Sequence, residues 1–155
     1  MRRRTLLAAA SASLATPAIA QAPRVLRFVP QANLTILDPI ITTAAVTANH
    51  GWMVFDTLYG VNAKLEAKPQ MAEGHTVSAD GRTWLIKLRP GLKFHDGEPV
   101  RAIDCIASLQ RWGKRDGFGQ LLSAAVDAWV PLDDRTFDVK LKRPFPLLLA
   151  ALAKN

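Results

Sequence analysis

The sequence contains little cysteine, no long run of one charge sign and, after its first residues, no long apolar stretch. Its one cysteine, Cys105, excludes an intrachain disulfide and a cysteine-based zinc site. Lysine and arginine number 20 against 13 acidic residues, but the two signs are interspersed. This disfavours nucleic-acid binding, which needs clustered cations to displace counterions from phosphates. The 155 residues suffice for one ordinary domain and are too few for two large domains with a cleft between them.

The N-terminal segment has the pattern of an export signal. Arginines at positions 2–4 precede an apolar run over residues 6–15, which is too short for a lasting membrane anchor. Small residues at 18–20 are of the kind that a signal peptidase reads, so we expect cleavage after Ala20. Two consecutive arginines ahead of an apolar stretch are also typical of twin-arginine signals, and both export routes stay open. We therefore expect residues 1–20 to be a signal peptide and the mature protein to be soluble in the periplasm.

Hydrophobic periodicity predicts a mixed α/β structure. Alternation with a period of two predicts half-buried strands, and apolar spacings of three and four predict helices. The predicted strands cover residues 24–29, 76–78, 83–89, 126–132 and 136–141. The predicted helices cover residues 43–58, 99–112 and 147–153, with Gly60 ending the first and Gly113 the second. Residues 117–119 contain two glycines and are predicted to form a loop.

Two further predictions concern turns and burial. Asp80-Gly81 is expected to form a hairpin turn, and Asp96 is expected to bond the backbone near Gly97. Cys105 falls on the apolar stripe of its helix and is expected to be buried and inert. The apolar helix over residues 147–153 needs a partner surface that the preceding chain is not expected to supply, so the sequence looks like an interrupted protein.

Signs of catalysis or metal binding are weak. His50, His75 and His95 are widely spaced, and no carboxylate recurs beside all three, so a metal site is disfavoured. No Gly-x-Ser-x-Gly elbow is present, which disfavours a hydrolase. Asp133 and Asp134 could pair as catalytic carboxylates, but such a pair is normal in a tight turn between strands. We expect neither an enzyme nor a cofactor nor a metal.

Six segments in register resemble one family, and together they extend over most of residues 24–155. They are Leu37-Asp38-Pro39, Phe55-Asp56-Thr57-Leu58, and residues 69–74, 77–84, 88–97 and 134–141. The sequence is similar to the family 5 bacterial extracellular solute-binding proteins, the peptide- and nickel-type receptors of ABC importers. One departure is Arg101, where the family usually has a threonine that caps a helix, so Asp104 would lack its reciprocal hydroxyl.

The resemblance implies the beginning of a two-lobed periplasmic-binding-protein fold. Residues 21–44 would be the first strand and loop of lobe one, and residues 45–155 would be a small α/β domain, incomplete at its C-terminus. The implied function is capture of a peptide or similar small solute for an inner-membrane ABC permease. The loop after the first strand would reach the cleft, which makes four residues candidates for solute contact: Gln31, Ala32, Asn33 and Leu34. A plain connecting loop stays an open reading of the same residues.

The alternative from a different class is an exported interaction or structural domain without a small-molecule ligand. Such a domain would be complete at Asn155 and would unfold cooperatively. A severed lobe would expose the face of residues 147–152 and self-associate.

Overall fold

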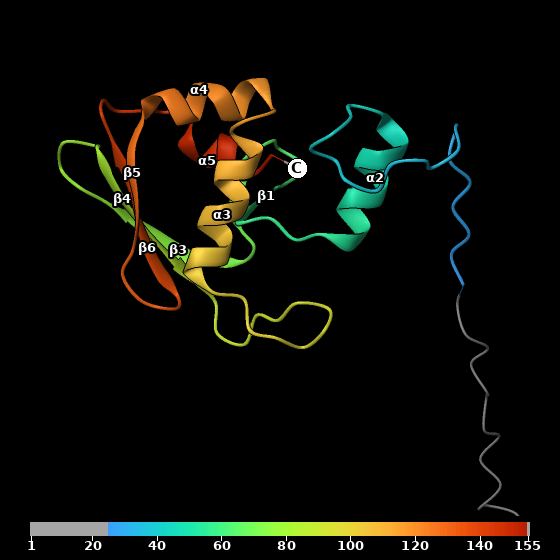
Figure 1. Cartoon of the computed structure of the whole chain (residues 1–155), viewed down its shortest axis with the longest axis horizontal. Coiled ribbons are helices and arrows are strands. Elements are labelled where there is room, and N and C mark those ends of the chain that lie inside the picture. The colour runs from blue at the N-terminus through green and yellow to red at the C-terminus, as the bar shows by residue number, and fades with distance from the viewer. Residues whose placement is uncertain (1–24, 155) are drawn as a thin grey trace, which may run out of the picture. The chain divides into compact units, whose positions relative to one another are not determined.

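A computed structural model describes residues 25–154 of the chain (Figure 1). The chain divides after Pro30 into two compact units, and the second unit begins at Gln31. The predicted signal peptide, residues 1–20, lies outside the described residues. All helices and strands given below belong to the second unit.

A four-stranded antiparallel sheet forms one layer of the second unit. Its strand order is β3 (Ala72–Val77), β4 (Thr83–Leu88), β6 (Thr136–Leu141), β5 (Val126–Pro131). Three helices lie on one face of this sheet: α3 (Ala102–Trp112), α4 (Gly117–Ala125) and α5 (Leu148–Leu152) (Figure 1). Alternate residues of the two central strands, including Ile86 and Phe137, point into the layer between sheet and helices and are fully buried. This burial is what the period-two alternation predicts.

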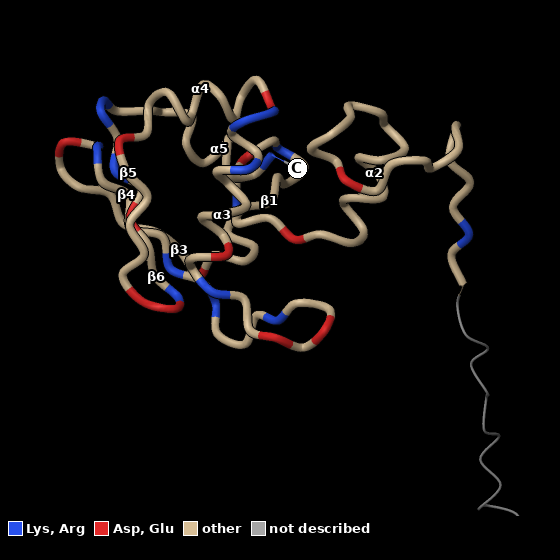
Figure 2. The backbone as a smooth tube through the Cα atoms, viewed as in Figure 1, with Lys and Arg blue, Asp and Glu red and all other residues tan. Residues whose placement is uncertain are grey.

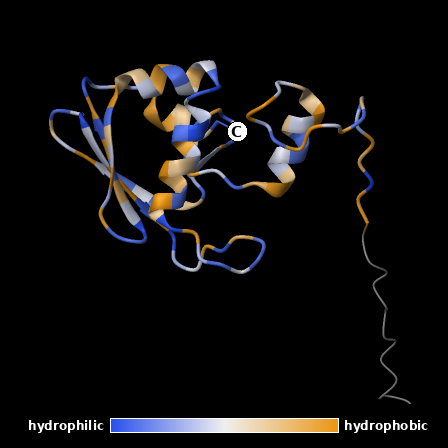
Figure 3. Ribbon diagram, viewed as in Figure 1, coloured by the Kyte–Doolittle hydropathy of each residue, from blue (hydrophilic) through white to orange (hydrophobic). Residues whose placement is uncertain are grey.

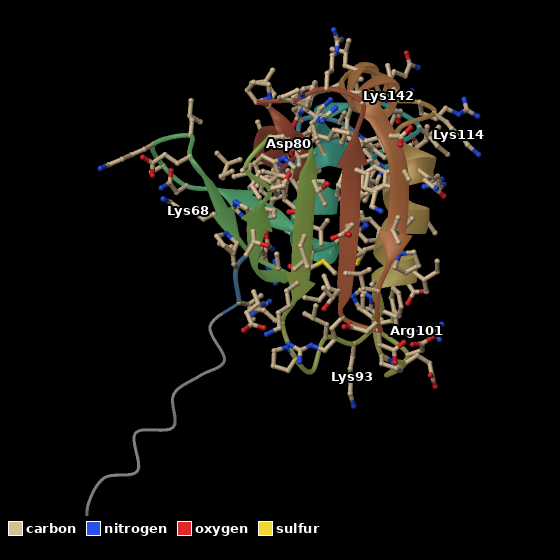
Figure 4. The ribbon with its side chains drawn as sticks, turned by 90° about the vertical axis from the view of Figure 1, so that its left-hand side faces the viewer. Lys68, Asp80, Lys93, Arg101, Lys114 and Lys142 are labelled. Atoms are coloured by element: carbon tan, nitrogen blue, oxygen red, sulfur yellow. The ribbon has the colours of Figure 1, made fainter. Side chains whose placement is uncertain are left out.

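Two further elements lie outside this pair of layers. Strands β1 (Tyr59–Val61) and β2 (Ala67–Pro69) form a small antiparallel hairpin, bonded to the start of β3 because Ala72 N donates to Leu58 O at 3.1 Å. Helix α2 (Ala45–Val54) lies on the far side of α3 from the sheet (Figure 1). Figure 4 shows Asp80 and Lys142 at one end of the sheet and Lys93 and Arg101 at the other.

The prediction of a strand over residues 24–29 is wrong for the residues that the structure describes. Val25 to Val29 have no regular secondary structure. A strand exists only through a ladder of hydrogen bonds, and no described segment supplies a partner ladder for these residues. Their apolar side chains are instead exposed, with Leu26 93% and Val29 87% accessible.

The first predicted helix is shorter than its apolar pattern indicates. Helix α2 ends at Val54, because Phe55 is already extended at φ −111° and ψ 140°. Gly60 does not end this helix; it pairs with Lys68 in the β1–β2 hairpin. The helix predicted over residues 99–112 is confirmed as α3 but begins only at Ala102, and Gly113 is its C-cap residue as predicted.

Helix α4 replaces the loop that the two glycines predicted. The Asp116 side chain caps it, accepting hydrogen bonds from Phe118 N at 2.8 Å and Gly119 N at 3.1 Å. A Cβ at Gly119 would lie 2.9 Å from Trp112 Cδ2, so this glycine allows α4 to approach α3 closely. The glycine that suggested a loop is thus required for helix packing.

The expectation that residues 147–153 lack a partner surface is also wrong. Leu148, Ala151 and Leu152 are at most 2% exposed, because α5 packs on α4 and on β1. Leu147, which precedes the helix, and Ala150 on the outer face of the helix are exposed. The preceding chain therefore does supply a surface for this helix.

The predicted turns and the predicted burial of Cys105 are confirmed. Gly81 and Gly97 both have positive φ angles, 68° and 93°, and Glu98 N donates to Asp96 Oδ1 at 3.0 Å. Cys105 is 7% exposed, and burial, together with the nearby Asp104 charge, raises the pKa of its thiol to about 11. At neutral pH the thiol is therefore protonated and a poor nucleophile.

The N-terminus of α3 has half of a capping box. Asp104 Oδ2 accepts a hydrogen bond from Arg101 N at 2.9 Å. The Arg101 guanidinium has no lone pair with which to return the bond, and Asp104 N bonds the Arg101 backbone carbonyl at 3.0 Å. The side chains also form an exposed ion pair at 3.6 Å.

Candidate functional site

The four residues predicted to contact a solute form an exposed segment at the start of the second unit. We call Gln31, Ala32, Asn33 and Leu34 the candidate solute loop. Gln31 and Ala32 form a bend, and all four residues are exposed. The described residues provide no side-chain hydrogen bond to any of the four, so the loop presents its polar groups to solvent.

Two contacts fix the chain just after the candidate solute loop. The Thr47 hydroxyl, on α2 and 1% exposed, donates to Ile36 O at 2.7 Å. Asp38 Oδ1 accepts from Ile40 N at 3.0 Å, and its other carboxylate oxygen pairs with the Arg111 guanidinium of α3. The Arg111 hydrogen bond is the main reason that the pKa of Asp38 is lowered, so the carboxylate is charged at neutral pH.

Pro39 completes this arrangement. Its ring packs on Gly51 of α2, where an added Cβ would lie 3.5 Å from Pro39 Cγ. The segment Leu37-Asp38-Pro39 thus connects the loop to two helices, through Pro39 to α2 and through Asp38 to α3. The sequence showed this motif as a family resemblance but gave no sign of its partners.

A set of large apolar side chains is exposed on α2 and on the loop before it. We call this set the apolar surface; Figure 3 shows orange apolar stretches in this region. Its members are Leu34, Ile36, Leu37, Ile41, Trp52, Met53 and Phe55. Their exposed fractions run from 38% to 68%. Several exposed apolar side chains within one short stretch of chain make this region a candidate contact surface.

Other residues of the family-like segments bond one another. Gln70 Nε2 donates to Asp56 Oδ1 at 2.6 Å, and the Thr57 hydroxyl donates to Gln70 Oε1 at 3.2 Å. These bonds join the segment after α2 to the segment that leads into β3. Their role is to hold the β1–β2 hairpin in place.

Arg135 joins three strands at the end of the sheet where β3 begins. Its Nε and Nη2 donate to Leu88 O at 3.1 and 2.8 Å, and Nη2 pairs with Glu73 Oε2 at 3.1 Å. The neighbouring Asp134 carbonyl accepts from Ala102 N at 2.8 Å and so fixes the start of α3. The pair Asp133-Asp134 therefore serves the turn, with Asp133 Oδ1 accepting from Arg135 N at 2.7 Å.

The three histidines do not converge on a metal site. His75 bonds Tyr59 Oη through Nδ1 at 2.7 Å and stacks on Trp84 with ring centroids 5.1 Å apart. Among residues 25–154, no group of three or more His, Cys, Asp or Glu side chains is arranged to hold a metal ion.

One open hollow of about 240 Å³ lies on β3 and β4, away from the candidate solute loop. Its lining includes Glu73 and Lys87, which pair with each other at 3.1 Å.

Figure 2 shows acidic and basic residues interspersed along the described chain. Within the described part, no helix has the length and apolarity needed to cross a membrane.

Comparison with known proteins places this architecture in a family. The family model "Bacterial extracellular solute-binding proteins, family 5 Middle" matches residues 66–155. The chain is 40% identical over 121 residues to the "Probable peptide ABC transporter periplasmic-binding protein y4tO" of Sinorhizobium fredii, covering 78% of this chain and 23% of that protein. It is 29% identical over 157 residues to the glutathione-binding protein GsiB of Pectobacterium atrosepticum, covering 99% of this chain and 30% of that protein.

Solved structures give the same result for the fold. The pheromone receptor PrgZ matches with a TM-score of 0.67 and 25% identity, over 76% of this chain and 27% of that one. MoaA in complex with mannopinic acid, from A.tumefacien R10, matches with a TM-score of 0.66 and 29% identity, over 75% of this chain and 25% of that one. The fold is thus that of part of an α/β periplasmic binding protein.

The chain belongs to family 5 of the bacterial extracellular solute-binding proteins. It spans about a quarter of the length of the curated relatives that it matches.

Proposed function

We propose that this chain is part of the substrate-binding component of an ABC importer, which captures a peptide or a similar small solute in the periplasm and delivers it to an inner-membrane permease. Its family membership carries this proposal. The relative y4tO is named as a probable peptide ABC transporter periplasmic-binding protein, and GsiB is named as a glutathione-binding protein. Proteins of this kind bind and release a solute without chemical change, so we expect no catalysis.

The structure supports different roles for two parts of the chain within such a receptor: the small domain and the candidate solute loop. The second unit supplies a small α/β domain with its own core, and the candidate solute loop precedes that domain. The proposed boundaries are a signal peptide over residues 1–20, a lobe-one segment over residues 21–44 and the small domain over residues 45–155. In this arrangement the candidate solute loop contributes contacts at one edge of the cleft.

The apolar surface fits the same division. Seven large apolar side chains remain exposed on the loop, on α2 and directly after α2, in a domain whose own core is well buried. A receptor polypeptide that continues over the remaining length of the relatives would cover this surface. An exported interaction domain would offer the same surface to a separate protein, so the experiment must distinguish the two.

A chimera provides that test. The matching segment of the Sinorhizobium fredii relative is replaced by residues 24–155 of this chain, and the unmodified relative serves as the control. If this chain is a receptor part, the chimera folds and gains thermal stability on binding the same peptides as the control. A chimera that folds but loses peptide binding, beside a control that binds, contradicts the proposal and favours the interaction domain.

A further inference from the structure

The candidate solute loop is held in place from one side only. The loop begins the second unit, and within the described residues its own side chains make no hydrogen bonds. The first fixed point after it is Ile36, whose carbonyl accepts the Thr47 hydroxyl, and the second is Asp38. The position of the loop therefore depends on these two contacts and on the packing of Pro39 on Gly51.

Because few residues separate the candidate solute loop from Ile36, a contact that holds Ile36 also restricts where the loop can lie. Ile36 follows Leu34 by two residues, and an extended chain spans at most about 3.6 Å per residue. Leu34 must therefore lie within about 7 Å of Ile36 when Ile36 is held. Release of Ile36 and Asp38 would free the loop to swing over a much larger range.

Arg111 connects the second of these points to a rigid element. It lies in the last turn of α3, next to the buried Trp112, and the same helix buries Ile106 in the core. Its partner Asp38 is 73 residues away in sequence. The Asp38–Arg111 pair thus links the segment after the loop to α3, in addition to the contacts that Thr47 and Gly51 of α2 make with Ile36 and Pro39.

We propose that Asp38 and Arg111 are positioning residues for the solute: their ion pair joins the segment after the candidate solute loop to α3, so that the loop, which Thr47 and Gly51 attach to α2, keeps one orientation relative to α3. This inference rests on the proposed function in treating the loop as a solute contact. The attachment itself depends only on the contacts described above.

The pair is suited to a local rather than a global role. The Arg111 side chain is 55% exposed and that of Asp38 is 31% exposed, and exposed ion pairs add little to overall stability. Loss of Arg111 should therefore loosen the loop without lowering the melting temperature appreciably. A looser loop with an unchanged melting temperature would distinguish a positioning role from a contribution to overall stability.

The test compares Arg111→Gln with Arg115→Gln, which makes the same change in charge. Arg115 is exposed shortly after α3, and its side chain has no ion pair within the described residues. Backbone NMR relaxation is measured for the folded chain without solute. We expect larger backbone motion at residues 31–37 in Arg111→Gln only, unchanged relaxation in the sheet, and partial recovery in Arg111→Lys, which keeps the charge. Unchanged loop motion in Arg111→Gln would overturn the proposal.

A second arm addresses the solute. Triglycine is added at about 10 mM, where even a weak complex with a millimolar Kd is populated. Shift changes at residues 31–34 that occur in the wild type and in Arg115→Gln, but not in Arg111→Gln, support positioning for the solute. Equal changes in all three proteins overturn it. If loop order depends on Arg111 but triglycine shifts no loop signal, the attachment stands and the solute contact of the proposed function fails.

Discussion

Replacement of Gly119 by alanine tests the packing of α4 on α3 directly. A Cβ at this position would lie 2.9 Å from Trp112 Cδ2 and 3.0 Å from Gly113 Cα, well inside the 3.5–4.0 Å of an ordinary carbon contact. Both atoms belong to rigid groups, a ring and the backbone. Gly117 in the same helix has no atom within 4 Å of its would-be Cβ and provides a matched control.

The expected magnitudes follow from two opposing effects. Alanine improves helix propensity over glycine by up to about 1 kcal/mol, and both variants gain it. Overpacking a filled site costs about 1–3 kcal/mol, and only Gly119→Ala incurs this cost. We therefore expect Gly117→Ala to raise the free energy of unfolding by about 0.5–1 kcal/mol and Gly119→Ala to lower it by about 1 kcal/mol.

Urea denaturation followed by tryptophan fluorescence measures both free energies. Trp112 is itself one of the four tryptophans, so its emission reports on the altered contact. The m-values of the two variants should agree with that of the wild type, which shows that the change lies in stability. If Gly119→Ala proves as stable as Gly117→Ala, α4 does not pack against Trp112 as closely as the 2.9 Å separation indicates.

Three further predictions concern single groups and the isolated chain. Tyr59 is the one tyrosine of the sequence, and burial raises its pKa to about 12 from 10.0, so tyrosinate absorbance should appear at a midpoint near 12. The stability linked to the neutral phenol is present below pH 10 and lost as the pH rises through about 12; a midpoint of 10 in the folded protein would refute its burial. Cys105 should react slowly with a thiol reagent at neutral pH and at full rate in urea, and fast labelling of the native protein would count against its burial. Calorimetry of residues 21–155 with di- to pentapeptides should show binding weaker than about 1 mM, because one domain leaves most of a peptide in water, whereas micromolar affinity would mean that the chain already forms a complete cleft.

Strands β4 and β6 were predictable because their pattern is local, whereas β1 and β2 were not predicted. In β4 and β6 alternate residues face the core, so the sequence itself carries the period of two that identifies them. Helix α4 was not predictable in this way. Its cap at Asp116 and the close contact between Gly119 and Trp112 join residues whose relation appears only once α3 and α4 are packed.

Burial was predicted less well than secondary structure. The apolar helix α5 suggested an unpartnered face, but α4 and β1 cover it. The seven exposed residues of the apolar surface lie instead on α2, on the loop before it and directly after it, at irregular spacings that follow no single period. The sequence did contain one indication that α2 has a second contact surface. Ala45–Val54 contains no Asp, Glu, Lys or Arg, and a helix without a charged face is usually buried on more than one side.

The candidate solute loop was found through resemblance, and its attachment was found only through the structure. Asp38 gave no indication of Arg111, because nothing in a sequence marks a pair 73 residues apart. The same holds for Gln70 with Asp56 and for Arg135 with Leu88.

These pairs explain why family resemblance in this chain does not identify a solute. The motif side chains described here bond the backbone or one another, and they fix the order of hairpin, sheet and helix. Proteins that this chain matches are named for peptides and glutathione or were solved in complex with mannopinic acid, and these solutes differ widely in shape and charge. A substitution in such a pair should therefore change stability or loop order, whereas a change of solute preference should require substitutions among residues that face the cleft, of which Gln31, Ala32, Asn33 and Leu34 are the candidates in this chain.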